Sequence, residues 1–388
     1  MKTIGLIINP IAGMGGKVGL KGTDSPEILQ EAIKRGAQPI ANKRSISFLE
    51  ELIKHLEHKK MHFIIPQGDM GENVFKSLYN VSSTLSWQVI TEIPIPKETT
   101  QKNTIRVAEY LKKIKVDLLL FVGGDGTARD IQQAVGPEFP ILGIPSGVKM
   151  HSGVFSHGIK KGVQVLRQFV QNNVQLMKSE IIDIDEKDFR QDRITTRLYG
   201  VCLVPQVPSM VQHGKLVSYL QNSEKDNLEG IIQSYQKSIN PDTLYILGSG
   251  STIKELARAF SNEIYDQKTL LGIDAVQNLN LIGRDLGESE ILRLLENKKK
   301  EFIRIVVTII GGQGFIFGRG NQQLSADVIR QVGLRHIDFV ATRSKINNLP
   351  NRRLYVDTGD LELDNQFPRY AKVLVDYNQY LMVKIESV

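Results

Sequence analysis

The 388-residue chain contains a single cysteine, Cys202, and this scarcity limits its chemistry. One cysteine permits neither an internal disulfide framework nor a cysteine-rich metal site, so a reducing cytoplasm is the expected location. Long apolar runs are missing too: none reaches the ~20 residues that a membrane-spanning helix needs. We therefore expect no membrane partner. The opening stretch MKTIGLIIN is too short an apolar run for a secretory signal and is predicted to be a first strand.

Concentrated positive charge is also missing, although the net charge is +7. The basic residues are scattered, and no basic patch is interleaved with aromatic side chains. Nucleic-acid-binding domains usually gather their basic residues into such a patch, so we expect no nucleic acid partner. A moderate positive charge instead favours a small anionic substrate that carries phosphate.

The first 150 residues alternate between short apolar strands and helical patterns. Strands are predicted at 3–8, 62–66, 87–93, 116–122 and 141–144, with helices at 48–56 and 105–114. Ser47 and Glu50 form a capping-box pattern before the first of these helices. The run VDLLLFV (116–122) is apolar almost throughout, as parallel strands covered on both faces are. This order predicts an open parallel sheet with helices on both faces.

The pattern changes from about residue 151. A linking helix is predicted at 160–177 and sheet at 181–204, followed by a second α/β pattern and by tail strands at 353–357, 371–376 and 381–385. We expect a nucleotide-phosphate-binding domain at 1–155 and a second domain with β-rich segments at 156–205 and 351–388. An α/β block at 206–350 would be inserted between those segments. The predicted fold class is α/β: an N-terminal open parallel sheet, then C-terminal β segments with a large α/β insertion.

Three glycine-rich turns follow predicted strands of the first domain. They are NPIAGMGGK (9–17), VGGDGT (122–127) and IPSGVKMHSG (144–153). In an open α/β sheet, ligands bind outside the carboxyl ends of the strands, where all three turns fall. Glycines let backbone N–H groups approach an anion, and the helix after GGDGT adds free N–H groups and a positive dipole end. Each turn is therefore a candidate phosphate-binding turn.

Asp125 is unexpected in such a turn, because a carboxylate repels phosphate unless a metal ion or a proton transfer uses it. It could take a proton from an attacking hydroxyl or hold Mg²⁺ through water. The structural alternative is that Asp125 only caps the helix predicted at 126–135, since Asp is a favoured N-cap residue.

GGDGT after an apolar strand resembles the signature of the superfamily that contains NAD kinases and diacylglycerol kinases. NPIAGMGG resembles that superfamily's asparagine-glycine turn after strand one. Together with FVGGDGTARDI, LGIPSGVKMHSGVF, GSGST and GGQGFIFGRGNQQLSADVIRQVG, these stretches resemble the ATP-NAD kinase-like proteins of the acetoin-catabolism protein X branch. The resemblance covers most of the chain. It implies an N-terminal sheet of the NAD kinase type and a magnesium-dependent kinase that makes NADP from NAD or NADPH from NADH, with ATP or polyphosphate as donor.

The resemblance also implies roles for residues of the three turns. Asp125 would be the general base that deprotonates the ribose 2′-hydroxyl, with Mg²⁺ bridging the donor phosphates. Nucleotide and phosphate contacts would come from Asn9, Gly13, Gly15, Gly16, Gly123, Gly124, Gly126 and Thr127, with Ser146, Gly147, Lys149 and His151 lining the site in the third turn. The alternative for His151 is a plain polar loop residue. Lys17, Lys21 and Arg129 are either cationic partners of phosphate or plain surface residues. No residue is assigned as a direct metal ligand.

The second half departs from ordinary NAD kinases, because we find no counterpart of the Asn-Glu or Asn-Asp pair with which their second domain meets the nucleotide. GSGSTIKELA resembles the phosphate turn of ribose-5-phosphate isomerase-like proteins, and a structural helix start is the alternative. The loop 311–325 is rich in glycine and side-chain amides; it could bind ligand or satisfy its own backbone groups. The predicted second-domain contacts are Gly248, Ser249, Gly250, Ser251, Thr252, Arg319, Asn321 and Gln322.

Two other functions stay open at this point. A kinase of the same fold could act on a different hydroxyl acceptor, or a non-catalytic protein could use the turns to sense a nucleotide or sugar phosphate. The carboxylate of Asp125 argues against a sensor, which gains little from negative charge beside phosphate. Because NAD kinases are commonly oligomers, analogy predicts a homo-oligomer.

Overall fold

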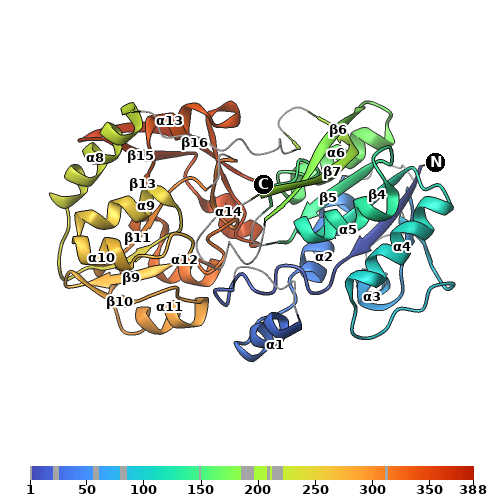
Figure 1. Ribbon diagram of the computed structural model, residues 1–388, viewed down its shortest axis with the longest axis horizontal. Helices are drawn as coiled ribbons and strands as arrows, with labels where there is room; N and C mark the ends of the chain where they lie inside the picture. Colours follow the sequence, from blue (N-terminus) through green and yellow to red (C-terminus); the bar gives the residue numbers. More distant parts are fainter. Residues whose placement is uncertain are drawn as a thin grey trace. The chain divides into compact units, whose positions relative to one another are not determined.

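The computed structural model describes residues 2–20, 26–55, 61–78, 85–147, 150–184, 196–207, 210–211, 222–310 and 313–388. The chain divides into two compact α/β units (Figure 1). Unit 1 comprises Met1–Met14 and Gly22–Gly214, and unit 2 comprises Gly15–Lys21 and Lys215–Val388. None of the helices in the described ranges is long and apolar enough to cross a membrane.

Unit 1 is built on a five-stranded parallel sheet in the order β3-β2-β1-β4-β5. Its strands are β1 (Thr3–Ile8), β2 (Met61–Ile65), β3 (Leu85–Val89), β4 (Leu118–Gly123) and β5 (Ile141–Pro145). This confirms the predicted parallel sheet, and every residue of β4 is buried, as its apolar run indicates. The strand order reverses at β1, which places β1 and β4 side by side, and ligands bind at such reversal points in open α/β sheets.

Helices lie on both faces of this sheet (Figure 1). The helix α4 (Gln101–Lys113) packs beside α5 (Asp125–Val135), and α2 (Ala41–Lys54) packs beside α6 (Ile159–Val170). Two further helices are α1 (Pro26–Lys34) and α3 (Glu72–Ser77). The capping box predicted at Ser47 and Glu50 is wrong, because α2 begins at Ala41 and both residues lie in its interior. Apolar spacing located the helix but not its first two turns.

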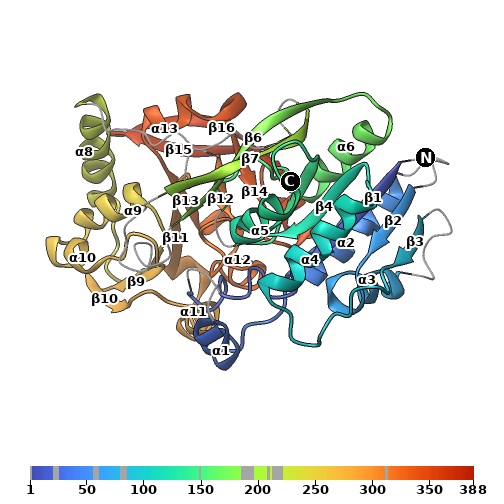
Figure 2. The same cartoon turned by 45° about the vertical axis from the view of Figure 1, so that its right-hand side comes forward.

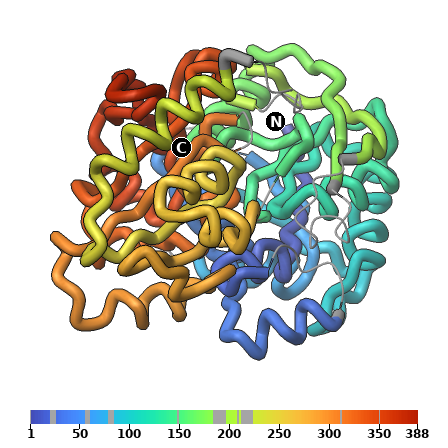
Figure 3. Tube along the Cα trace, turned by 60° about the vertical axis from the view of Figure 1, so that its left-hand side comes forward, coloured from blue at the N-terminus to red at the C-terminus, as the bar shows by residue number. Residues whose placement is uncertain are grey.

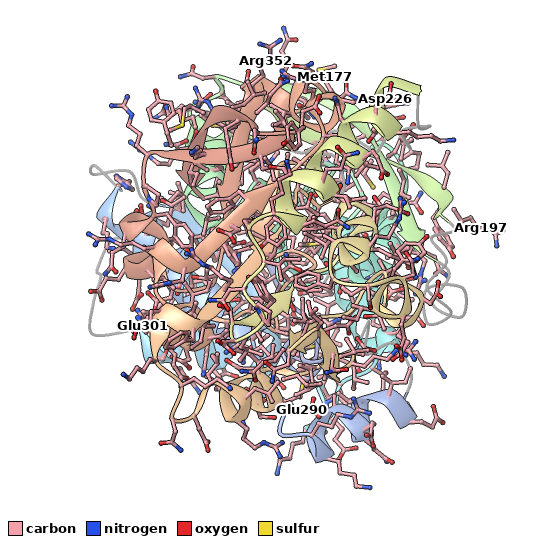
Figure 4. All side chains as sticks on the ribbon, turned by 90° about the vertical axis from the view of Figure 1, so that its left-hand side faces the viewer. Met177, Arg197, Asp226, Glu290, Glu301 and Arg352 are labelled. Atoms are coloured by element: carbon pink, nitrogen blue, oxygen red, sulfur yellow. The ribbon has the colours of Figure 1, made fainter. Side chains whose placement is uncertain are left out.

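After α6 the chain forms a two-stranded antiparallel ribbon of β6 (Gln175–Ile184) and β7 (Thr196–Gln206), which Figure 2 shows in green. The ribbon packs against α5, and Leu203 bridges to Pro140 just before β5. Met177 and Arg197 of the ribbon are exposed, and both are labelled in Figure 4. Through these contacts the segment 156–205 belongs to unit 1.

Unit 2 is built on a nine-stranded mixed sheet in the order β10-β9-β8-β11-β13-β15-β16-β14-β12. Strands β8, β11, β13 and β15 run parallel to one another, whereas β9 and β16 are antiparallel to β8 and β15. The strands are β8 (Leu244–Leu247), β9 (Asp274–Gln277), β10 (Asn280–Gly283), β11 (Ile303–Val307), β12 (Phe315–Phe317), β13 (Ile337–Val340), β14 (Arg353–Val356), β15 (Tyr370–Asp376) and β16 (Gln379–Ser387). The tail strands β14 to β16 share this sheet with β8, β11 and β13. The structure therefore groups 351–388 with 215–350, rather than with 156–205 as the expected domain division had it.

The unit 2 sheet is buried on both faces. Along β8, Leu244 and Ile246 join one apolar core, while Tyr245 and Leu247 join another on the opposite face. Helices α8 (Asn222–Gln236), α9 (Ser251–Leu256) and α10 (Asn262–Gln267) cover the second core, and Figure 3 shows them in yellow-green to gold in front of the orange strands. Helices α11 (Glu288–Leu295), α12 (Ala326–Val332), α13 (Arg343–Asn347) and α14 (Leu361–Gln366) contribute to the first core. The chain is thus α/β, with an N-terminal parallel sheet and a C-terminal mixed sheet.

Candidate functional site

The turns after β1, β4 and β5 meet at the carboxyl edge of the unit 1 sheet, because these strands are neighbours. The Ser146 N–H donates to the carbonyl oxygen of Gly123 at 2.9 Å, which joins the second and third turns. A Cβ on Gly13, whose φ is +80°, would overlap the carbonyl oxygen of Ser146, and a Cβ on Gly124 would lie 3.4 Å from Cα of Gly147. Glycine at these positions therefore allows three backbone segments to approach one another.

Asn9 ties the end of β1 to the first turn of α5. Its Nδ2 donates to Oγ1 of Thr127 at 2.9 Å, and its Oδ1 accepts a hydrogen bond from the Ile11 N–H at 3.3 Å. The Asn9 side chain is thus committed to holding the turns together. The Thr127 hydroxyl only accepts in this pair, so its own proton stays available to another acceptor.

Asp125 is the first residue of α5, and only 5% of it is exposed. Its Oδ2 accepts a hydrogen bond from the His151 N–H at 2.6 Å, and its Oδ1 accepts from the N–H and the hydroxyl of Ser152 at 3.0 and 2.6 Å. Gly124, not Asp125, is the N-cap residue of α5. The structure therefore does not support helix capping as the role of this carboxylate, which faces the third turn.

Burial raises the pKa of Asp125 from 3.8 to about 7. The hydrogen bonds from Ser152 and His151 favour the ionised form and oppose this rise, while the nearby charge of Asp183 adds to it. At neutral pH the carboxyl group is therefore divided between its protonated and ionised forms. A general base works best in that range, because its ionised form is populated and still basic enough to take a proton.

Unused hydrogen-bond donors surround Asp125. Within the described part of the chain, the backbone N–H groups of residues 125–127 have no acceptor, and the first helical bond of α5 runs from the Ala128 N–H to Gly124. The Ser146 hydroxyl is also without a partner among the described residues, and Ser146 is 3% exposed. Free N–H groups at the start of an 11-residue helix, together with a buried hydroxyl, suit an anion such as phosphate.

The predicted cationic partners of phosphate that the structure describes, Arg129 and Lys17, lie beside carboxylates instead. Nη1 of Arg129 lies 2.7 Å from Oδ2 of Asp183 on β6, and Nζ of Lys17 lies 3.1 Å from Oε1 of Glu288 in unit 2. Lys21 and Lys149 fall outside the described residues. Arg129 and Lys17 are therefore ion-paired within their own units.

Gly15 and Gly16 belong to unit 2, although they were predicted to hold donor phosphates with the rest of the first turn. A Cβ on Gly16 would overlap the side-chain amide of Gln322, and the Gly15 carbonyl oxygen accepts a hydrogen bond from the Leu20 N–H at 2.8 Å. Close packing against Gln322 therefore accounts for glycine at position 16. Gly126 and Gly147, by contrast, lie at the carboxyl edge of unit 1 with the remaining predicted residues.

The two predicted stretches of the second half come together after β8. The N–H of Ser249 donates to Oδ1 of Asn321 at 2.9 Å, and the Ser249 hydroxyl lies within hydrogen-bond distance of the same oxygen and of the Gly320 carbonyl. Asn321 is fully buried and donates to the Ile316 carbonyl at 3.1 Å. Ser249 and Asn321 thus join the turn 248–252 to the loop. The Arg319 guanidinium stacks over the Phe315 ring at 4.0 Å from its centroid.

Some residues that shape these sites carry no sequence motif. Ser152 lies within the third glycine-rich turn, yet nothing in that turn distinguishes it as the partner of Asp125. Asp183, Thr308 and Lys345 were also missed. Polar residues that directly follow a buried parallel strand, as Thr308 follows β11, are the signal that could have found one of them.

Two family models match the chain: the ATP-NAD kinase N-terminal domain over residues 4–174 and the ATP-NAD kinase C-terminal domain over residues 241–385. Comparisons with curated proteins and with solved structures found no match. The first matched region runs from β1 through α6, so it contains the whole carboxyl-edge site. The matches indicate a kinase that phosphorylates NAD-like substrates, whereas membership of the acetoin-catabolism protein X branch stays a prediction. On these two matches, the chain belongs to the NAD kinase-like family.

Proposed function

We propose that the protein transfers a phosphoryl group from ATP or polyphosphate to the 2′-hydroxyl of NAD or NADH, with Asp125 as the general base. The observation that carries this proposal is a buried carboxyl group of pKa about 7 beside unused N–H donors, in a chain of this family. Desolvation makes the carboxylate basic, and the N–H donors can bind phosphate oxygens. A proton acceptor and an anion site next to each other are what phosphoryl transfer to a hydroxyl requires.

The hydrogen bonds of Asp125 leave room for one more donor. A carboxylate offers about four lone-pair directions, two on each oxygen. The N–H and hydroxyl of Ser152 occupy both directions on Oδ1, while the His151 N–H occupies one on Oδ2. The remaining direction on Oδ2 would accept the 2′-hydroxyl. Ser152 and His151 would thereby orient the base as well as hold its pKa near neutrality.

In the proposed reaction, Asp125 removes the 2′-hydroxyl proton while that oxygen attacks the terminal phosphorus of the donor. The bond from this phosphorus to its bridging oxygen breaks, and the shortened donor leaves with the electron pair. The free N–H groups of residues 125–127 and the Ser146 hydroxyl would hold phosphate oxygens. Mg²⁺ would enter with the donor and neutralise its phosphates.

Purified protein, Mg²⁺, NAD or NADH, and either ATP or polyphosphate should yield NADP or NADPH, detected by mass spectrometry. Asp125→Asn keeps the side-chain volume but removes the base, so kcat/KM should fall by about 10²–10⁴. Asp130→Asn is the matched control, since Asp130 lies on the same helix and its Oδ1 accepts a hydrogen bond from Nε2 of Gln101 at 2.6 Å. Activity should persist in this variant.

Three results would count against the proposal or narrow it. No transfer by the wild type to either dinucleotide overturns it, and full activity of Asp125→Asn removes the general base. Transfer to another hydroxyl compound, lost in Asp125→Asn, would keep the chemistry and change the acceptor. Tight nucleotide binding without any product would instead favour the sensor. A cytoplasmic location and a homo-oligomer stay predictions.

A further inference from the structure

Lys345 lies where three parallel strands of unit 2 end. Strands β8, β11 and β13 are neighbours in the sheet, and the chain leaves their carboxyl ends through the turn 248–252, through Thr308 and through the segment 341–345. This edge is the usual place for a ligand in an open α/β sheet. It lies wholly within unit 2 and shares no residue with the carboxyl edge of unit 1.

The Lys345 ammonium group is held by hydroxyls. Its Nζ donates to Oγ1 of Thr252 at 2.5 Å and to Oγ of Ser251 at 3.3 Å, and Lys345 forms no ion pair within the described chain. Burial lowers the pKa of Lys345 to about 8, and the charge of Glu224 opposes that fall. Glu224 is itself buried and accepts a hydrogen bond from the Thr342 hydroxyl at 3.1 Å. The ammonium is therefore desolvated and lacks a direct counter-ion.

Further unused hydrogen-bond donors belong to this turn or to residues next to it. The N–H groups of residues 251–253 have no acceptor among the residues that the structure describes, whereas the Gly250 N–H is used by Leu270 at 2.7 Å. The Thr308 hydroxyl is likewise without a partner in the described ranges, and Thr308 is 1% exposed. A Cβ on Gly250, whose φ is +111°, would lie 3.0 Å from Cγ2 of Thr308, so the methyl group of this threonine packs directly against the turn.

We propose that the turn 250–253, with Lys345 and Thr308, binds the phosphate group of a phosphorylated small molecule. The short helix α9 does not carry the argument. The argument rests on the buried Thr308 hydroxyl, which has no partner in the described ranges, and on the Lys345 ammonium, which has no direct counter-ion; Thr308 and Lys345 both contact that turn. The ammonium and the hydroxyl are donors that the oxygens of a phosphate group can use, and the N–H groups of the turn would add to them. Glu224 is positioned to keep Lys345 charged, since its charge raises the lysine pKa.

Residue-resolved amine labelling of the full chain tests the site without relying on activity. Acetylation would be followed by mass spectrometry at about pH 8, in inorganic phosphate and in sodium chloride of equal ionic strength. Phosphate should slow the labelling of Lys345 several-fold, because a bound anion covers the amine and holds it protonated. Lys298 is the internal control, since it is half-buried and donates to a neutral oxygen of Gln277 at 3.0 Å.

Thr308→Val removes the hydroxyl and keeps the side-chain shape. The phosphate concentration needed for half protection of Lys345 should rise roughly three- to tenfold, as expected for one lost hydrogen bond. Thr243→Val, at the other end of β8, should leave it unchanged, and melting curves would show that both variants fold. Protection by chloride alone, or equal protection in Thr308→Val, would overturn the site. Protection that persists in Asp125→Asn would show that this site does not depend on the proposed kinase chemistry.

Discussion

Replacing Ser152 with alanine should shift the acidic limb of the kinase pH profile upward. The Ser152 Oγ accepts a hydrogen bond from the Ile182 N–H at 3.1 Å, so its own proton can go either to Asp125 at 2.6 Å or to the Ile182 carbonyl at 2.9 Å. The ionised carboxylate is the stronger acceptor, and the hydroxyl therefore stabilises the charged base. Alanine removes that stabilisation but keeps both backbone donors at residues 151 and 152.

The size of the shift follows from the strength of this bond. A hydrogen bond to a charged group contributes about 1.5–3 kcal/mol, and each pKa unit corresponds to about 1.4 kcal/mol. Starting from a pKa of about 7, Asp125 should become basic enough to move the limb up by about one to two pH units. The charge of Asp183 also acts on Asp125, but Asp183 stays paired with Arg129 in the variant and should not offset the rise in the pKa of Asp125.

Initial rates of NADP formation at low substrate, between about pH 5 and pH 10, would give kcat/KM and thus the ionisation in the free enzyme. Ser156→Ala is the matched control, because Ser156 is also buried but donates to the Gly158 carbonyl at 2.9 Å. Its profile should follow the wild type. If the limb of Ser152→Ala stays in place or moves to lower pH, the hydroxyl does not stabilise the ionised base and the argument fails.

Three stability predictions follow from the same structure. The folded-state pKa of Asp125 is raised from 3.8 to about 7, so its contribution to the free energy of unfolding is greatest below pH 3.8. That contribution falls by up to about 4 kcal/mol as the pH rises through 7. Urea unfolding should show this pH dependence in the wild type and not in Asp125→Asn. Gly13→Ala should lower the free energy of unfolding by more than about 3 kcal/mol because its Cβ meets backbone atoms. Gly36→Ala, at φ +84° in open space, should lower it by only about 1–2 kcal/mol. Equal losses of stability in melting experiments would refute the steric account. Lys268→Met should cost about 3–5 kcal/mol in urea unfolding because it leaves the fully buried Asp274 without its ion pair at 3.2 Å, and a near-neutral effect would contradict this.

The unit 1 sheet could be predicted from the sequence because its strands are short segments rich in apolar residues, and glycine-rich turns follow β1, β4 and β5. The parallel order also follows from local rules, since each strand is joined to the next by a helix. The strands of unit 2 were recognisable too, but their partners were not. β14 pairs with β16 and β12 rather than with its predecessor β13, and such pairings depend on tertiary packing that no local pattern records. The division into domains was misjudged for the same reason.

At the candidate site, the sequence identified the functional carboxyl group but not the residues that set its pKa. GGDGT singles out Asp125, whereas its pKa depends on burial and on residues 26 and 27 positions further along the chain. Ser152 and Asp183 act on the same carboxylate in opposite directions. Asp183 lies outside the motifs, and nothing in the third turn singles out Ser152. A glycine-rich turn with one aspartate could thus contain a permanently ionised carboxylate or a base that titrates near neutrality. The third turn and the ribbon β6–β7 decide between these two, which is why Ser152→Ala tests the proposed chemistry more directly than removal of Asp125 itself.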